Sequence, residues 1–286
     1  MLMNTETTLP DRSIGAILLD TGKLSINDVE QILRLQKEAN LRFGDAAVEL
    51  GLLTQSDIQH ALSHQYDYPY LLKNDESVSD KLVAAYNPFS PQVEALRTLR
   101  SQLMLRRFTG DANRKMLSIV SPGSKEGRSY LTANLAIVFS QLGERTLLID
   151  ADMRKPCQHE LFKLENRNGF SSILASRNDT QAVQRVNKFI DLSVLTAGPT
   201  PPNPQELLGR TALRALFHEL NERFDVILVD TPPAADFADA HILTARTGAA
   251  LMLTRKNKSL LELVRQQTES MVRSGIEVVG TVMSDF

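Results

Sequence analysis

The stretch that decides the fold is MLSIVSPGSKEGRSYLTANLA, residues 116–136. It reads as a short apolar strand over 116–120, a turn rich in small residues, and a helix beginning near Ser129. This order places successive backbone N–H groups and a helix N-terminus around one point, which is how proteins commonly bind phosphate groups. The turn is therefore a candidate phosphate-binding loop.

The loop departs from the pattern G-x-x-x-x-G-K-[ST] at two positions. Pro122 stands where the first glycine is expected, and Arg128 replaces the lysine. Because arginine keeps the charge but has a planar fork, our hypothesis is that Arg128 and Lys125 share the usual role of the lysine. The alternative is an ordinary glycine-containing turn. The predicted nucleotide-binding residues are Gly123, Ser124, Lys125, Glu126, Gly127, Arg128, Ser129 and Tyr130.

Outward from this loop, apolar runs alternate with helical patterns. The runs cover 145–150, 191–198, 224–230, 248–254 and 277–283, and helices are predicted over 129–142, 204–223 and 259–274. Nearly continuous apolar strands alternating with helices predict an α/β fold, with a parallel sheet covered by helices on both faces. Ligands of such sheets bind beyond the carboxyl ends of the strands.

Carboxylates follow two of these runs. Asp150 and Asp152 are two residues apart and so leave a strand on the same face, while Asp230 ends another run and precedes Thr-Pro-Pro. We expect Ser129, Asp150 and Asp230 to hold Mg²⁺, and Asp150 or Asp152 to orient or deprotonate an incoming hydroxyl. Arg154 would offset charge on the transferred group. The alternative for 150–154 is a solvated acidic loop.

These motifs together resemble the bacterial tyrosine kinases, a branch of the P-loop ATPases related to MinD and ParA. Asp150-x-Asp152-x-Arg154 resembles their second Walker motif, Asp230-Thr-Pro-Pro their Walker B motif, and GPTPPNPQELL (198–208) a segment typical of the family. The resemblance covers about residues 90–286. It implies ATP and Mg²⁺ as cofactors, with Arg128, Asp150, Asp152 and Arg154 as catalytic residues.

The same resemblance implies self-association. Glu94, Arg97 and Arg100 match a helix that mediates ring-shaped assembly in the family, and their spacing places them along one side of a helix. The alternative is a solvated charged face. Kinases of the family usually end in a tyrosine cluster, which this sequence lacks at Phe286. Tyr66, Tyr68 and Tyr70 are the alternative acceptor cluster.

A second feature is a repeat near the N-terminus. IGAILLDTGKLSINDVEQILRLQ, from Ile14, aligns without gaps on FGDAAVELGLLTQSDIQHALSHQ, from Phe43. Each copy predicts a short helix, a glycine stop, a capping box and a longer helix. We therefore expect a small all-α domain over 1–70, followed by a linker with one short helix over 71–90 and the P-loop domain over 91–286.

This repeat resembles the N-terminal domain of the ATPases of type II secretion and type IV pili. Some members bind cyclic di-GMP through an Arg-x-Gly start and a Gln end in each repeat, which implies Arg42 with Gln65 and, one position out of register, Arg12 with Gln36. The alternative is a docking module whose glycines serve only turns. The combination looks closest to the EpsG-type chain-length-determinant kinases of exopolysaccharide operons.

Composition limits the remaining classes. The 286 residues include 32 Lys and Arg against 34 Asp and Glu, so we expect no nucleic-acid partner, and one cysteine excludes an intrachain disulfide. Without a secretion signal or a long apolar run, we expect a cytoplasmic protein that a membrane activator, the chain-length-determinant protein, recruits to the inner membrane.

The leading hypothesis is ATP-dependent transfer of phosphate to tyrosine, in control of exopolysaccharide chain length and export. Two alternatives stay open. One is a MinD- or ParA-like ATPase switch without tyrosine transfer, which the missing tyrosine tail favours. The other is a catalytically silent scaffold that responds to cyclic di-GMP, which Pro122 and Arg128 favour.

Overall fold

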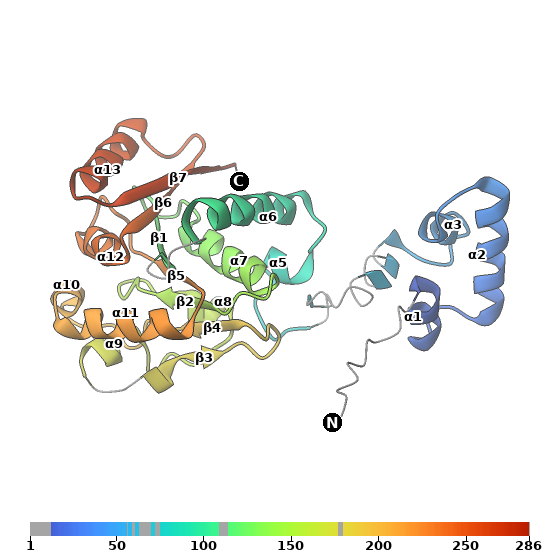
Figure 1. The fold of residues 1–286 in the computed structure, drawn as a ribbon, viewed down its shortest axis with the longest axis horizontal. Helices are drawn as coiled ribbons and strands as arrows, with labels where there is room; N and C mark the ends of the chain where they lie inside the picture. The colour runs from blue at the N-terminus through green and yellow to red at the C-terminus, as the bar shows by residue number, and fades with distance from the viewer. Residues whose placement is uncertain are drawn as a thin grey trace, which may run out of the picture. The chain divides into compact units, whose positions relative to one another are not determined.

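A computed structural model describes residues 13–55, 57–58, 61–62, 70–71, 75–108, 114–176 and 180–285. The chain divides into two compact units, Met1–Pro69 and Tyr70–Phe286 (Figure 1). Among the described residues, none of the helices has the length and apolar character needed to cross a membrane.

The described elements of the first unit are helices. They are α1 (Ile14–Asp20), α2 (Ile26–Ala39) and α3 (Phe43–Glu49). Both predicted capping boxes form, because the Ser25 hydroxyl accepts from Asp28 N and the Asp28 carboxylate accepts from Ser25 N, and Thr54 and Asp57 do the same. Ile32, Ala46 and Ala47 are fully buried at the centre of this unit.

The second capping box makes a pH prediction. The Thr54 hydroxyl, the Thr54 backbone N–H and Lys23 stabilise the charged Asp57 carboxylate and lower its pKa to about 2. An acid whose pKa falls on folding stabilises the fold above its unfolded value of about 3.9, and that stability is lost as the pH falls through the folded value. An NMR titration of the full chain should therefore find Asp57 ionised down to about pH 2. Thr54→Ala should return its pKa toward about 3.9.

The second unit is built on one sheet, in the order β3-β4-β2-β5-β1-β6-β7. The strands are β1 (Met116–Val120), β2 (Thr146–Asp150), β3 (Gln184–Arg185), β4 (Leu192–Leu195), β5 (Val226–Asp230), β6 (Ala249–Arg255) and β7 (Glu277–Ser284). All neighbours pair in parallel except the antiparallel β3 and β4. The predicted α/β fold with a mainly parallel sheet is confirmed.

Helices cover both faces of this sheet (Figure 1). Alternate strand residues such as Leu117 and Leu148 pack with α7 (Arg128–Ser140), whereas Leu147 and Ile227 pack with α11 (Thr211–Arg223). The other elements are α5 (Val83–Tyr86), α6 (Pro91–Leu103), the π-helical turn η1 (Met104–Phe108), α8 (Gln158–Leu161), α9 (Phe170–Leu174), the 3-10 turn η2 (Thr180–Ala182), α10 (Pro204–Leu208), α12 (Asp239–Thr247) and α13 (Leu261–Arg273).

Two sequence predictions need correction. The single helix expected over 204–223 is two helices, because Arg210 takes an extended backbone conformation between α10 and α11. The stretch expected as a linker over 71–90 does form the short helix α5, but its described part belongs to the second unit. Val78, Leu82 and Ala84 are buried in the core that α7 shares, so these residues pack rather than connect.

A close backbone approach predicts the cost of one substitution. A Cβ added to Gly169 would lie 2.2 Å from Thr196 O and 2.4 Å from Gly198 N, and main chain cannot move aside as a side chain does. We expect Gly169→Ala to destabilise the second unit by more than about 3 kcal/mol in thermal or denaturant unfolding. Gly209→Ala is the matched control, because its nearest contact would be 3.4 Å at a negative φ, and it should melt like the wild type.

Candidate active site

The three predicted motif segments meet at the carboxyl edge of the sheet. β5 lies between β1 and β2, so the loops that follow these strands are neighbours. Asp150 and Asp230 are direct partners in the β2–β5 register. Backbone bonds from Ala234 N to Ser121 O and from Ala235 N to Pro122 O join the loop after β5 to the start of the candidate phosphate loop.

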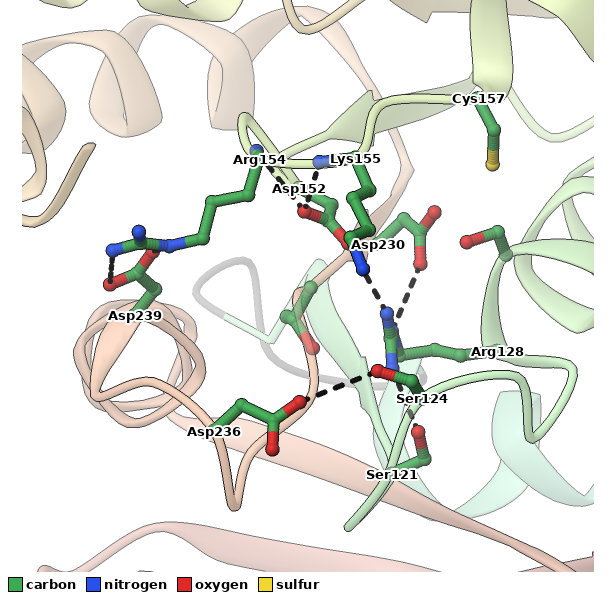
Figure 2. A network of polar contacts seen from close by, with 12 residues as sticks. Ser121, Ser124, Arg128, Asp152, Arg154, Lys155, Cys157, Asp230, Asp236 and Asp239 are labelled. Atoms are coloured by element: carbon green, nitrogen blue, oxygen red, sulfur yellow. Dashed lines mark hydrogen bonds and ion pairs between the residues drawn. The ribbon is translucent and has the colours of Figure 1, made fainter. Parts of the chain in front are cut away.

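Arg128 lies at the centre of this edge and faces carboxylates (Figure 2). Its guanidinium contacts Ser121 Oγ at 2.8 Å, Asp152 Oδ2 at 3.4 Å and Asp230 Oδ1 at 3.4 Å. The side chain is 7% exposed. In the structure, the arginine that replaces the lysine therefore neutralises the buried carboxylates, and the hypothesis that it shares a phosphate contact with Lys125 stays a prediction.

Asp150 is buried and held by the segment that follows it. Its Oδ2 accepts from Cys157 N at 3.1 Å and from Gln158 N at 3.0 Å, and its Oδ1 accepts from Asp152 N at 3.3 Å. Burial, and next the negative charge of Asp230, raises the pKa of Asp150 well above its usual range. Burial and the charge of Asp230 thus disfavour the ionised form of Asp150, and a cation placed beside the two carboxylates would stabilise that form.

Asp230 is fully buried at the end of β5. Burial raises its pKa, and the charge of Arg128 with hydrogen bonds from Ser129 and Gln158 acts in the opposite direction. Its Oδ2 accepts from Gln158 Nε2 at 2.8 Å, whereas Oδ1 has only the 3.4 Å ion pair with Arg128. Among the described residues no donor meets this buried oxygen in normal hydrogen-bond geometry, although the Ser129 hydroxyl lies close enough to Asp230 to lower its pKa.

Side chains of the loop between β6 and α13 donate hydrogen bonds to backbone carbonyls of the candidate phosphate loop. Lys258 Nζ donates to Ser124 O at 2.8 Å and to Lys125 O at 2.7 Å, and Arg255 donates to Lys125 O. Within the loop, the buried Glu126 carboxylate accepts from Gly123 N at 2.9 Å. The Gly123 N–H is therefore already used by a carboxylate, and the phosphate contacts of this loop stay a prediction.

Arg154 extends toward Asp239 and away from Asp230 (Figure 2). It makes two bonds to Asp239, at 2.8 and 3.3 Å, and its guanidinium lies 3.9 Å from the centre of the Phe237 ring. In the structure, Arg154 therefore connects the loop after β2 to the start of α12 through hydrogen bonds. The predicted role in offsetting transferred charge stays a prediction.

The donor set at this edge fits magnesium and a phosphate ligand. Two carboxylates and the Ser129 hydroxyl are oxygen ligands, and the buried Asp230 Oδ1 lacks a hydrogen-bond donor. Among the described residues, no cluster of three or more His, Cys, Asp and Glu side chains could bind a metal by itself. Mg²⁺ keeps several waters and shares phosphate oxygens, so it needs fewer protein ligands.

Sequence reasoning missed Gln158, Lys258 and Arg255. Gln158 lies in no recognisable motif, so no signal would have found it. Lys258 and Arg255 follow the β6 run within a cluster of cations, which is a usable signal for residues near a phosphate site. Cys157 also lies in this region, and its burial, followed by the charge of Asp230, raises its thiol pKa to about 12.

The remaining predicted residues lie elsewhere. In α6, Glu94 pairs with Arg97 at 3.2 Å on the surface, whereas Arg100 donates to Val138 O at 2.7 Å within the same unit. Of the cyclic di-GMP residues, Gln36 and Arg42 are described in the first unit, and Arg12 and Gln65 lie outside the described residues. Tyr66 and Tyr68 also lie outside them. The cyclic di-GMP site stays a prediction.

The sheet order and the loops at its carboxyl edge define the class. A parallel sheet with a phosphate-type loop after β1 and carboxylates after β2 and β5 is the arrangement of a P-loop nucleotide-binding protein. MinD from Pyrococcus furiosus is similar in fold, with a TM-score of 0.53 at 22% identity over 59% of this chain and 71% of that chain.

Sequence and structure comparisons define the family. The chain is 36% identical to the tyrosine-protein kinase YwqD of Bacillus subtilis over 71% of this chain and 85% of that protein. It is 35% identical to the tyrosine-protein kinase wzc of Salmonella typhimurium over 72% of this chain but 28% of that protein. The kinase domain of the Escherichia coli tyrosine kinase ETK has a TM-score of 0.70, with 29% identity over 77% of this chain and 85% of that chain.

No family model matches the sequence. The chain belongs to the bacterial tyrosine-protein kinase family and is a protein-tyrosine kinase.

Proposed function

We propose that the chain transfers phosphate from Mg-ATP to tyrosine in the control of exopolysaccharide synthesis and export. The observation that carries the proposal is the meeting of three segments at one buried point, where Asp150 and Asp230 face a phosphate-type loop. A relative from Klebsiella pneumoniae bears a name that places it in the cps region, which supports a role in surface polysaccharides.

Different residues would bind the metal, bind the phosphate groups and orient the acceptor hydroxyl. Ser129, Asp150 and Asp230 would hold Mg²⁺, which supplies neutralisation of phosphate charge when bound. The N–H groups of 124–129 would hold phosphate oxygens, because the Gly123 N–H already donates to the Glu126 carboxylate. Asp152 lies at the edge of the buried group and its Oδ1 accepts from Arg154 N and Lys155 N, so it is fixed in a position to orient an acceptor hydroxyl.

The acceptor hydroxyl comes from a protein tyrosine. Tyr86 is a poor acceptor, because its hydroxyl is bonded to Asp75 O and Val78 O in the second unit. We propose Tyr66 and Tyr68 as the acceptors of the predicted cluster, reached from a neighbouring copy when the α6 face with Glu94 and Arg97 self-associates. Tyr70, the third member, has a buried hydroxyl, and its ring packs edge-on against Phe89. A membrane chain-length-determinant protein would be the activator that recruits the kinase to the inner membrane.

Labelled ATP with Mg²⁺, followed by mass spectrometry, tests this function against its alternatives. The assay should be run with and without the cytoplasmic segment of the membrane activator. Phosphotyrosine is expected. Free phosphate without phosphotyrosine would favour the MinD-like switch, and neither product would favour the silent scaffold.

A further inference from the structure

One buried amide links all three motif segments of the candidate active site. Gln158, the first residue of α8, is fully buried. Its Nε2 donates to Asp230 Oδ2 at 2.8 Å and to Ser129 O at 3.1 Å, and its backbone N donates to Asp150 Oδ2 at 3.0 Å. We propose that Gln158 is a positioning residue, which fixes the orientation of the Asp230 carboxylate for the cation. This inference rests on the proposed Mg-ATP site.

The hydrogen-bond inventory of the carboxylate supports this role. Gln158 occupies Oδ2 of Asp230 and leaves Oδ1, which has no hydrogen-bond donor among the described residues. A carboxylate bonded through one oxygen cannot rotate freely, so Oδ1 stays directed toward Arg128 and the centre of the site. Residues that hydrogen-bond metal ligands in this way commonly set the affinity for the metal.

The Gln158 side-chain amide makes both of the hydrogen bonds that its NH₂ group can donate. Both Nε2 protons have partners on different elements, one on β5 and one at the start of α7. Its Oε1 is buried and has no hydrogen-bond partner among the described residues. A buried acceptor without a donor costs free energy, so packing alone does not favour glutamine over an apolar residue at this position. The unpartnered oxygen instead suits a donor that arrives with the ligand, such as a water.

The test is a titration with a fluorescent ATP analogue, with and without Mg²⁺, of the wild type, Gln158→Met and the control Gln141→Leu. Methionine keeps the length of the side chain and the backbone bond to Asp150 but removes both amide bonds. Gln141→Leu removes a bond from the end of α7 to Ala84 O, away from the carboxylates. We expect Gln158→Met to lose roughly 10- to 100-fold of the affinity gained with Mg²⁺. Its affinity without Mg²⁺ should change much less than the affinity gained with Mg²⁺, since Gln158 bonds to the carbonyl of Ser129 and leaves the Ser129 N–H for phosphate.

The outcomes separate this inference from the proposed function. If the wild type gains no affinity with Mg²⁺, the proposed function fails and the inference with it. If the wild type gains affinity and the folded Gln158 variant keeps that gain within about twofold, or Gln141→Leu loses as much, the positioning role alone is wrong. Melting curves establish folding. If Gln158→Met does not fold, Gln158→Asn replaces it, because its shorter stem cannot reach both acceptors, and the same criteria apply.

Discussion

Arg128→Ala is expected to unfold more easily than the wild type and to lose phosphotransfer. The guanidinium lies between Asp152, Asp230 and Ser121 with 7% of its side chain exposed. Removing one partner of a buried ion pair leaves the other charge uncompensated, which costs about 3–5 kcal/mol. In a unit of this size that corresponds to a fall in melting temperature of roughly 10 °C. Activity should fall at least ~100-fold, because the cation that we propose to contact the transferred phosphate is lost.

Added Mg²⁺ distinguishes this explanation from a general loss of packing. In the wild type, Arg128 already neutralises the carboxylates that Mg²⁺ would use, so the cation must compete with it. In Arg128→Ala those carboxylates lack a counter-charge, and Mg²⁺ should raise the melting temperature more than in the wild type. Arg145→Ala is the matched control, since it removes an exposed pair with Asp225 that is worth at most about 1 kcal/mol. Equal responses of Arg128→Ala and wild type to Mg²⁺ would contradict the account.

Asp150→Asn is expected to separate stability from activity. Burial and the charge of Asp230 raise the pKa of Asp150, so the fold loses stability as the pH rises from the unfolded value of this group, about 3.9, toward its raised folded value. The amide oxygen of asparagine can still accept from Cys157 N and Gln158 N. At neutral pH the variant should therefore melt at or above the wild-type temperature.

The same substitution removes a negative oxygen from the proposed metal site. Phosphotransfer should fall by roughly 10²- to 10³-fold, which is typical for the loss of one electrostatic contact to a reacting group. Steady-state kinetics and calorimetric melting on the same preparation check both parts. The control is Asp225→Asn at the exposed end of a surface pair, which should leave activity unchanged. A less stable Asp150→Asn that retains activity would show that the carboxylate has only a structural role.

The sequence predicted the site where strand geometry determines position. Asp150 and Asp230 end buried strands of a parallel sheet, so the apolar pattern places both at its carboxyl edge. Their direct pairing depends on β2 and β5 being neighbours, and the pattern does not give the strand order. The break between α10 and α11 could not be predicted, because apolar residues at 207, 208, 213 and 216 continue a helical spacing across Gly209 and Arg210.

Side-chain orientation was the second limit. Arg128 carries the charge expected of a phosphate-loop cation, but the sequence does not reveal that its guanidinium lies against Asp152 and Asp230. Gln158 illustrates the same limit, since its role depends on three hydrogen bonds across segments that are up to 72 residues apart. Such contacts are made by packing and leave no periodic pattern in the sequence.

Calorimetric titration of the full chain with ATP, in the presence and absence of Mg²⁺, tests the central claim most directly. We expect one nucleotide bound per chain with Mg²⁺, weaker binding without it, and loss of the Mg²⁺ effect in Asp150→Asn. No heat of binding at millimolar ATP with Mg²⁺, or equal affinity with and without the cation, would contradict it.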